Sequence, residues 1–400
     1  MANSIITLDM VTRKALEVLE NNCVLLRTVN RQYDPSFAQT GAKIGTTLRI
    51  RLPDRALVTD GAALSVQEEN QQYTTLTCSQ QKQVSMSFTS AEQTMSLDDY
   101  SELILKPRIS QLASTIDADL ASVYKYIGQS VGTAGTTPAT SAVLLAANQK
   151  LNESAAPMGD RHAVVNPAAN AALVEGMKGL FNPTGPISKQ FKSGLMGEGI
   201  LGLDDLSMSQ SIQNHTTGSR SAGATVTTTV ATQGATTIAV TTNGATDTIK
   251  LGDVFTVADC YAVNPQTRQS TGSLYQFVAL ADATASGSAV NITVAPIYTA
   301  SHALATVDSF PTATKAITWF GGVSTSYPQN LIYNKDAITF ASADLLMPKG
   351  VDMASRAVHN GISLRVVRAY DIATDRLVCR LDVLYGFAVI RPELAVRLWG

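Results

Sequence analysis

The sequence predicts an α+β protein, and three stretches carry this prediction. Residues 107–127 repeat apolar side chains at steps of three and four, the period that gathers them on one helix face. Residues 46–52 and 82–88 alternate apolar and polar side chains, as half-buried strands do. Residues 215–316 nearly lack charge and contain short Thr-, Ala- and Val-rich runs between Gly-centred turns. This pattern predicts a small antiparallel β-barrel or sandwich inserted into the α+β part.

The composition indicates a protein with many protein contacts. Charged residues make up 16% of the 400 residues and hydrophobic residues 45%, a balance suited to contact surfaces. An ordinary Thr- and Ala-rich β-protein fits equally well. The net charge of −2 provides no general attraction to nucleic acid. The chain from Arg356 onward is mildly basic and could face DNA, although solvated strand edges explain its arginines as well.

No stretch predicts a membrane span or a signal peptide. No run approaches eighteen apolar residues, and the N-terminus lacks the charged and apolar regions of a secretory signal. The cysteines at positions 23, 78, 260 and 379 lie far apart without a CxxC pair, which indicates free thiols in a reducing compartment. We therefore expect a soluble protein, made in a cytoplasm, with no membrane partner.

The first forty residues predict an arm. Residues 8–21 predict an amphipathic helix, and an irregular polar stretch follows up to Gly41. The apolar side of this helix comprises Met10, Val11, Ala15, Val18 and Leu19. Such an arm has little core of its own, so we expect it to be ordered by what it lies against.

The strands at 46–52 and 82–88 are joined by a polar excursion from Pro53 to Gln81. Pairing these two strands predicts an extended two-stranded finger, which is not stable alone in water and needs a neighbour for support. A loose surface hairpin is the alternative. The candidate contacts with neighbouring subunits at the finger tip are four charged residues: Arg55, Asp60, Glu68 and Glu69.

A long helix is predicted to follow. Ser96 can cap a first helical turn, Pro107 suits the start of the next helix, and Gly128 ends it. The apolar stripe comprises Ile109, Leu112, Ala113, Ile116, Leu120, Val123, Tyr124 and Ile127. We expect this stripe to lie on the long strands near the C-terminus. The opposite, small-polar side comprises Ser110, Ser114, Asp117, Ser122 and Lys125, and we expect it to face the interior of an assembly or a neighbouring subunit.

The rest of the chain predicts a second α/β unit interrupted by the β-rich insert. Residues 141–154 and 167–181 predict helices on either side of a short strand at 162–166. After the insert, mixed structure resumes at 317–347. Two long strands are then predicted around a turn at 373–375, and the second ends at Arg391-Pro392.

No motif nominates a catalytic, cofactor or metal site. Residues 197–202 match GxGxxG, but no strand precedes them and Glu198 would repel a pyrophosphate, so we expect a turn-rich loop. The four histidines, at 162, 215, 302 and 359, are scattered without ligand spacing. The acidic pairs at 98–99 and 204–205 are adjacent and fit helix caps better than acid–base pairs. We therefore predict no enzyme activity, no cofactor and no metal.

The order of these parts resembles the major capsid proteins of tailed phages, which share the Hong Kong 97-type fold. It is most similar to the Salmonella podophage coat protein type, which carries an inserted β-barrel domain. The resemblance rests on RHAVVNPAANAAL, GILGLDDLSMSQSI and the insert core beginning IKLGDVFTVADCYAV, and above all on LIYNKDAITFASADL followed by LVCRLDVLYGFAVIRPELAVRL.

The resemblance implies a division of the chain. It comprises an N-terminal arm at 1–40, an extended loop at 41–92, the spine helix of a peripheral domain at 93–130, an axial domain at 131–214 and 317–360, the inserted barrel at 215–316, and long peripheral strands at 361–400.

It also implies a function without catalysis. Copies of the chain would form pentamers and hexamers that close into an icosahedral shell around double-stranded DNA, which the inner face would contact non-specifically. A scaffolding protein, a portal protein at one vertex and a decoration protein are the further partners that the resemblance suggests. The rival hypothesis is a β-rich adhesin or other binding protein whose residues 215–316 form the recognition module.

Overall fold

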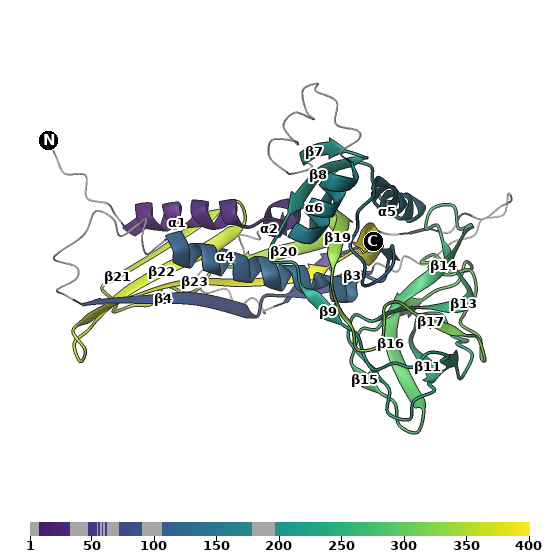
Figure 1. Ribbon diagram of the computed structural model, residues 1–400. Coiled ribbons are helices and arrows are strands. Elements are labelled where there is room, and N and C mark those ends of the chain that lie inside the picture. Colours follow the sequence, from purple (N-terminus) through teal and green to yellow (C-terminus); the bar gives the residue numbers. More distant parts are fainter. Residues whose placement is uncertain are drawn as a thin grey trace. The chain divides into compact units, whose positions relative to one another are not determined.

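The computed structural model describes residues 8–32, 47–53, 55–56, 58, 61, 72–89, 106–177 and 197–400 (Figure 1). The chain divides into two compact units. Unit 1 comprises residues 1–51, 73–121 and 338–390, and unit 2 comprises residues 52–72, 122–337 and 391–400. Both units contain helices and sheets, so the predicted α+β class is confirmed.

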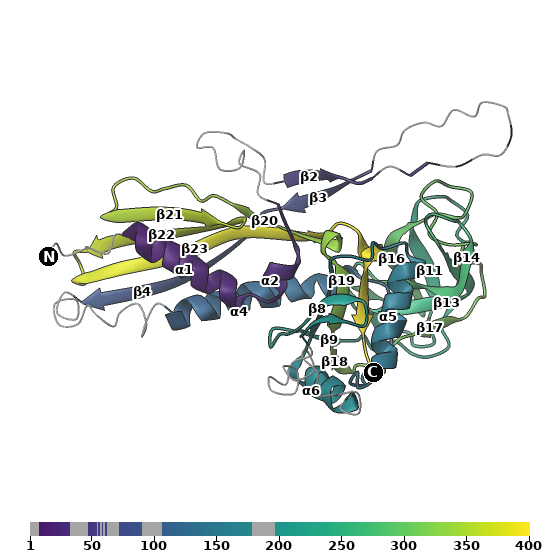
Figure 2. The same ribbon diagram turned by 90° about the horizontal axis from the view of Figure 1, so that it is seen from above.

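Unit 1 is built on a mainly antiparallel sheet with two longer helices along it (Figures 1 and 2). Strands β22 and β23 form a long hairpin, β20 continues along the same edge of β23 after β22, and β4 pairs with the opposite edge. The two long strands predicted around residues 373–375 are thus confirmed. The strands of this sheet are β1 (Asn30–Gln32), β4 (Gln80–Thr89), β20 (Ile338–Ala343), β21 (Met353–His359), β22 (Ile362–Asp371) and β23 (Arg376–Val389).

The helices of unit 1 are α1 (Leu8–Asn22), the short α2 (Leu25–Thr28) and α4 (Lys106–Ala121). Helix α1 contacts β21, β22 and α4, and helix α4 contacts α2 and β4. The apolar side chains between them are fully buried, namely Ala15, Leu16, Leu19, Ile109, Leu112, Ala113, Ile116 and Leu120. Both predicted helices are therefore confirmed. The predicted continuation to Ile127 is a 3₁₀ helix, η3 (Ser122–Tyr126).

Two predictions for unit 1 are wrong. The strand predicted at 46–52 is β2 (Thr47–Arg51), but it pairs with β3 (Tyr73–Thr77), not with 82–88. The 82–88 strand is β4, which pairs with β23 and buries its apolar Met86. The ribbon of β2 and β3 is anchored by a different buried side chain, Leu76 of β3. The position predicted for Asp117, facing the interior of an assembly or a neighbouring subunit, is also wrong, since its side chain is buried against the backbone of residues 24–26.

Unit 2 contains a mixed sheet in the order β5-β24-β19-β6-β8-β7. Its strands are β5 (Ser130–Val131), β6 (Arg161–Val165), β7 (Gly197–Ile200), β8 (Leu203–Met208), β19 (Asn330–Asn334) and β24 (Ala395–Leu398). Helix α5 (Ser141–Glu153) contacts β24 and β5. Helix α6 (Pro167–Gly176) begins at Asn166, whose side chain accepts a hydrogen bond from the Ala169 N–H, a standard N-cap. The predicted helix–strand–helix order is confirmed for the residues described.

The β-rich segment of unit 2 forms three small antiparallel sheets, with orders β10-β11-β16, β14-β13-β17 and β12-β15. The strands are β10 (Thr225–Val226), β11 (Ala235–Thr241), β12 (Thr248–Ile249), β13 (Val254–Val263), β14 (Ser270–Val278), β15 (Ala283–Thr284), β16 (Ala289–Ile297) and β17 (Ile317–Trp319). The strand pairing does not join these sheets into one closed ring among the described residues, so a closed barrel stays a prediction.

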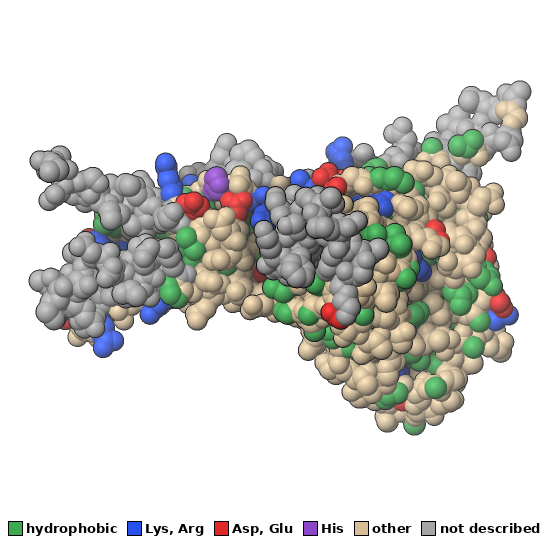
Figure 3. Space-filling model, turned by 45° about the horizontal axis from the view of Figure 1, so that its top comes forward, with side chains coloured by type: hydrophobic (Ala, Val, Ile, Leu, Met, Phe, Trp, Pro, Cys, Tyr) green, Lys and Arg blue, Asp and Glu red, His purple; other side chains and the backbone are tan. Residues whose placement is uncertain are grey.

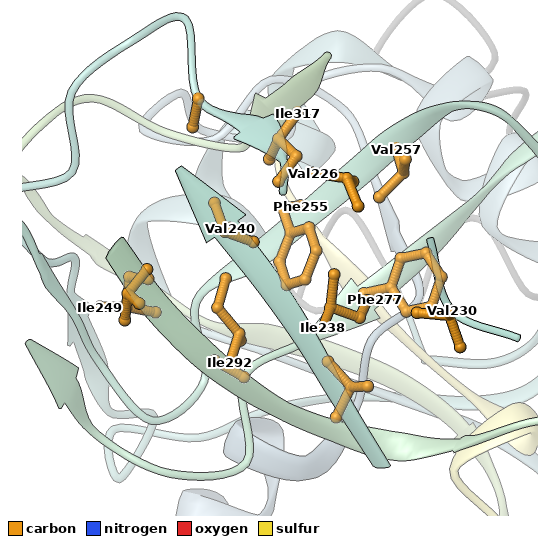
Figure 4. Close-up of a cluster of buried hydrophobic side chains, with 14 of the residues drawn as sticks. Val226, Val230, Ile238, Val240, Ile249, Phe255, Val257, Phe277, Ile292 and Ile317 are labelled. Atoms are coloured by element: carbon orange, nitrogen blue, oxygen red, sulfur yellow. The ribbon is translucent and has the colours of Figure 1, made fainter. Parts of the chain in front are cut away.

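The three sheets share one hydrophobic core (Figure 4). Phe255 lies at its centre with Ile238 and Val240 beside it, and the Phe255 and Phe277 rings stack with centroids 5.5 Å apart. Fully burying side chains of this size contributes roughly 1.5–3 kcal/mol each. The segment therefore has a core of its own. It begins after β9 (Asn214–Thr216), which pairs with β18 (Ser326–Pro328).

Candidate functional site

Three of the four residues predicted to make contacts at the finger tip lie outside the described residues, namely Asp60, Glu68 and Glu69. Arg55 is described, and its Nη2 lies 3.0 Å from Oε1 of Glu393, which also accepts a hydrogen bond from Nε of Arg391 at 3.3 Å. In the single subunit Arg55 is therefore already engaged in an ion pair. All of these ions are about one quarter exposed, where an ion pair is worth about 1 kcal/mol or less.

The ribbon formed by β2 and β3 presents one buried and one exposed face. Leu76 is fully buried and packs with Cys78 and Ala341. The opposite face carries Tyr73, which is 57% exposed, with the Arg49 guanidinium 5.2 Å from its ring centroid. A two-stranded ribbon is marginally stable alone. Its base is held by unit 1, and its other face is open to a partner.

The tip of the β22–β23 hairpin exposes apolar side chains. Ile372 is 86% exposed, Tyr370 is 49% exposed and Val378 is 38% exposed. The turn itself is rigid, because Asp371 accepts hydrogen bonds from the Ala373 N–H and the Thr374 hydroxyl and the Tyr370 hydroxyl donates to Asp375. A rigid hairpin that ends in exposed apolar groups is suited to docking against another protein surface.

The surface is otherwise poor in charge. The face seen in Figure 3 shows thinly scattered charged side chains on a largely uncharged surface. This matches the 16% of charged residues in the sequence.

Several of the charges are buried, and one cluster of them lies within unit 2 around Asp253. Its Oδ1 lies 2.9 Å from His215 Nε2 and 2.7 Å from Arg220 Nη1. Its Oδ2 accepts the backbone N–H groups of Gly218 at 3.2 Å and Lys250 at 2.9 Å. Burial pulls the pKa of Asp253 upward, but the His215 hydrogen bond, the charge of Arg220 and the Lys250 N–H outweigh it, so the pKa lies below its ordinary value.

Aromatic rings and a second arginine surround this cluster. The Tyr124 hydroxyl lies 3.4 Å from Nδ1 of His215, and the Tyr327 ring stands edge-on to the His215 ring. Arg397 of β24 is fully buried, donates through Nη1 to the Gly252 carbonyl at 2.8 Å and lies over the Tyr124 ring. The cluster thus connects η3, the β-rich segment and β24 within unit 2.

A second junction in unit 2 joins β5 to β14. The Gln276 side chain accepts the Ser130 N–H at 2.7 Å and donates to the Ser130 carbonyl at 3.0 Å, as a strand would. The approach is so close that a Cβ on Gly128 would lie 2.6 Å from the Gln276 carbonyl oxygen. Only glycine fits there without a shift of the backbone.

An open groove of about 630 Å³ lies beside α5, and Arg161 forms part of its lining. The guanidinium of Arg161 donates to side-chain oxygens of Asn148 and Asn152 and to the carbonyls of Ala156 and Pro157. Because these bonds use all three of its nitrogens, Arg161 serves to hold the loop after α5. The groove therefore has a structural polar lining and not a free cation for a ligand.

Asp117 joins two segments of unit 1. Its Oδ2 accepts the N–H groups of Val24 at 2.9 Å and Leu25 at 3.2 Å, and its Oδ1 accepts that of Leu26 at 3.2 Å. These are free N–H groups at the start of α2, which a carboxylate satisfies and whose partial positive charge it complements. Burial raises the pKa of Asp117, although the three N–H groups draw it down. Asp117 thus adds a polar anchor between α4 and the start of α2 to the apolar packing between these helices.

Sequence reasoning missed both carboxylates and the arginines around Asp253. A usable signal existed for Arg220, since it is an isolated charge in a stretch nearly without charge, and an isolated buried ion needs a partner. Helical spacing places Asp117 on the polar side of its helix, but it describes a single helix and does not reveal that residues 24–26 of the same subunit cover that side. Asp204 and Asp205 lie in strand β8 and not at a helix start, so the predicted capping role is wrong.

The GxGxxG match is a hairpin. Residues 197–202 form β7 and the turn into β8, with positive φ angles at Leu201 and Gly202. A dinucleotide site requires a helix at this point. Within the described ranges no group of three or more His, Cys, Asp or Glu side chains is arranged to hold a metal ion. None of the described helices combines the length and hydropathy needed to cross a bilayer.

Comparison with solved structures finds phage and virus-like shells among the similar chains. A chain from Mycobacterium phage Che8 is 14% identical with a TM-score of 0.48, and the match covers 94% of this chain and 90% of that one. The bacteriophage PhiM1 mature capsid gives 11% identity and a TM-score of 0.43, covering 94% and 87%. The CUS-3 coat protein I-domain is 24% identical with a TM-score of 0.21, covering 26% of this chain and 98% of that one.

Family comparison gives a match along the whole sequence. No curated protein matches the chain. The model of the family described as "P22 coat protein - gene protein 5" matches residues 1–400. The chain therefore belongs to the P22 coat protein family and is a major capsid protein, a subunit of the phage head shell.

Proposed function

We propose that the subunits associate as pentamers and hexamers through two peripheral elements, the β2–β3 ribbon with its loop and the tip of the β22–β23 hairpin. The observation that carries this proposal is Ile372, a large apolar side chain that is 86% exposed on a turn rigidified by Asp371. Exposed apolar groups on a rigid element are typical of contact surfaces. In a closed shell many contacts of modest strength add to a stable assembly.

The loop between β2 and β3 is the second contact element in this proposal. Asp60, Glu68 and Glu69, together with Arg55, would meet oppositely charged groups of a neighbouring subunit. The Arg55–Glu393 ion pair would then exchange with an intersubunit pair during assembly. The separation of residues 1–40, 41–92 and 361–400 as arm, extended loop and peripheral strands follows the Hong Kong 97-type arrangement that we infer for the chain.

The β-rich segment, residues 215–316, acts in this proposal as a module that stiffens the subunit and touches its neighbours. The hydrophobic core around Phe255 supports independent stability, and the Asp253 cluster supports a rigid attachment to the rest of unit 2. Deleting the module should leave unit 1 folded and should impair assembly.

The further partners follow from the requirements of a head shell. We infer a scaffolding protein during assembly, a portal protein at one vertex, packaged double-stranded DNA held non-specifically on the inner face, and in some shells a decoration protein. Synthesis in the cytoplasm of the bacterial host fits the four cysteines, which are all free and buried. The subunit works as a building block without catalysis in this proposal, and the saturated hydrogen bonds of Asp253 and Arg161 suit structural roles.

Assembly of purified protein tests the proposal. The wild type should form shells on addition of its scaffolding protein, as seen by sedimentation and negative-stain electron microscopy. Ile372→Asp should lower the yield of shells at least tenfold while the circular dichroism spectrum and urea unfolding of the monomer stay unchanged. Met158→Asp, which charges a side chain that is 78% exposed elsewhere in the chain, is the matched control. Normal assembly by Ile372→Asp would show that the hairpin tip is no contact.

A further inference from the structure

Arg397 is a fully buried cation with only part of its hydrogen bonding satisfied. Its Nη1 donates to the Gly252 carbonyl at 2.8 Å, and its guanidinium carbon lies 5.3 Å from the Tyr124 ring centroid. Its Nε and Nη2 have no acceptor among the residues that the structure describes. A buried donor without a partner is costly, and it costs more when it belongs to a charged group.

The surrounding charges do not balance. Asp253, the carboxylate of this cluster, is already bonded to His215, Arg220 and two backbone N–H groups. No Asp or Glu in the described part of the chain lies within 4.0 Å of Arg397. Two buried guanidinium groups therefore face one carboxylate, an excess of at least one positive charge. Burial lowers the pKa of Arg397 to about 10, although the nearby Asp253 raises it.

Two further unpaired groups lie on the same face of the sheet. Trp399 comes directly after β24 and two residues after Arg397. Its N–H donates to the Val131 carbonyl and so continues the pairing with β5, which places both side chains on one side. Ser130 is directly opposite Arg397 in the parallel pairing of β5 and β24. Trp399 is 1% and Ser130 2% exposed, and neither Trp399 Nε1 nor Ser130 Oγ has a partner in the described ranges. Tyr327 contacts the rings of both Trp399 and His215, which places these groups beside the Asp253 cluster.

We propose that a small monovalent anion of the chloride class binds beside Arg397, accepting hydrogen bonds from Arg397 Nε and Nη2, Trp399 Nε1 and Ser130 Oγ. The two arginine N–H groups and the indole N–H are donors only, so their common partner must be an acceptor. A single negative charge also cancels the excess positive charge, which a water molecule leaves in place. Gln329 Oε1, a buried acceptor without a partner beside β19, would be satisfied by a water molecule and not by the anion.

The full-length monomer provides the test without any assumption about assembly. The protein is exchanged into methanesulfonate buffer, and its thermal midpoint is measured while chloride or bromide replaces methanesulfonate at constant ionic strength. A bound anion should raise the midpoint along a saturating curve, because a ligand that binds only the folded state stabilises it by mass action. Crystals soaked in bromide should then show one anomalous peak beside Arg397.

Variants distinguish this site from general salt effects. Arg397→Met should abolish the halide response, whereas Lys250→Met, which removes a half-exposed positive charge from the same segment, should keep it. Trp399→Phe and Ser130→Ala keep the charge and remove one donor each, so the apparent halide affinity should fall about tenfold. These two variants carry the test if Arg397→Met does not fold. Three results would overturn the proposal. They are a thermal midpoint of the wild type that is insensitive to halide, a halide response in Trp399→Phe and Ser130→Ala that equals that of the wild type, and electron density beside Arg397 that fits water only.

Discussion

Replacing Asp117 tests how the N-terminal helices are attached to the long helix of unit 1. In Asp117→Ala, the N–H groups of Val24, Leu25 and Leu26 lose their acceptor. The bonds to Leu25 and Leu26 are fully buried, and each unsatisfied buried donor costs about 1–3 kcal/mol. Removing Asp117 also removes the cost of burying its charge, which offsets part of the loss. We therefore expect a net loss of about 2–4 kcal/mol in the free energy of unfolding.

Asp117→Asn refines this prediction, because the amide keeps one oxygen as an acceptor and loses the charge. We expect it to cost about 1–2 kcal/mol, between the wild type and Asp117→Ala. The matched control is Gln111→Ala, a change at an exposed position of the same helix, which should stay within about 0.5 kcal/mol of the wild type.

The assay combines urea unfolding of the monomer, followed by circular dichroism, with hydrogen exchange of the peptide that contains residues 24–26. Loss of the acceptor should speed exchange at these amides before it affects β22 and β23. Unchanged exchange at residues 24–26, or an Asp117→Ala protein within 0.5 kcal/mol of the wild type, would refute the anchoring role.

Three further changes test other parts of the structure. Gly386→Ala should lower the free energy of unfolding, measured with urea, by about 1–3 kcal/mol, because the added methyl group would overlap the Thr77 carbonyl. A variant as stable as the wild type would show that β23 can shift to make room. Asp253 has a lowered pKa in the folded state. Its contribution to the stability of the folded protein is therefore present above its ordinary pKa of about 3.9 and is lost as the pH falls through its pKa in the folded state. Between pH 5 and pH 3 the thermal midpoint of Asp253→Asn should therefore fall less steeply than that of the wild type, and equal slopes for the two proteins would contradict this. Changing both Glu68 and Glu69 to Lys should lower the yield of shells in electron micrographs while the stability of the monomer stays unchanged, and changing both to Gln should give an intermediate yield. Normal shells from the double Lys variant would contradict the proposed contact at the finger tip.

The helices and most strands could be predicted from the sequence because their patterns are local. The stripe from Ile109 to Leu120, the Asn166 cap and the turn at 373–375 depend on side chains within a few residues of one another. Strand pairing is not local. β2 and β4 have the same alternation, and nothing within either segment indicates that β2 pairs with β3 while β4 pairs with β23. The weakly apolar YTTLT of β3 has one buried side chain, Leu76, which is too faint a signal to identify a strand.

The partners of the buried polar groups could be predicted even less well than the strand pairing. Asp117 lies on α4 and binds residues more than ninety positions earlier, and Arg397 meets Gly252 across a similarly large separation. Helical spacing and composition carry no information about such distant partners. Composition does provide one indication, since a rare charge in an uncharged stretch, such as Arg220, must be paired where it is buried.

The buried carboxylates reveal how a chain with few charges keeps its segments in place. Asp117 holds residues 24–26 on α4, Asp253 holds residues 215–220 beside 250–253, and Asp382 accepts hydrogen bonds from Arg365, Arg380 and Gln81 on three adjacent strands. Each carboxylate accepts hydrogen bonds from at least three donors, and at least one of these donors belongs to a segment distant in the sequence, so the carboxylate fixes how those segments are arranged. The assembly that we propose requires this internal rigidity, because the hairpin tips would have to meet identical neighbours at the same places in every copy.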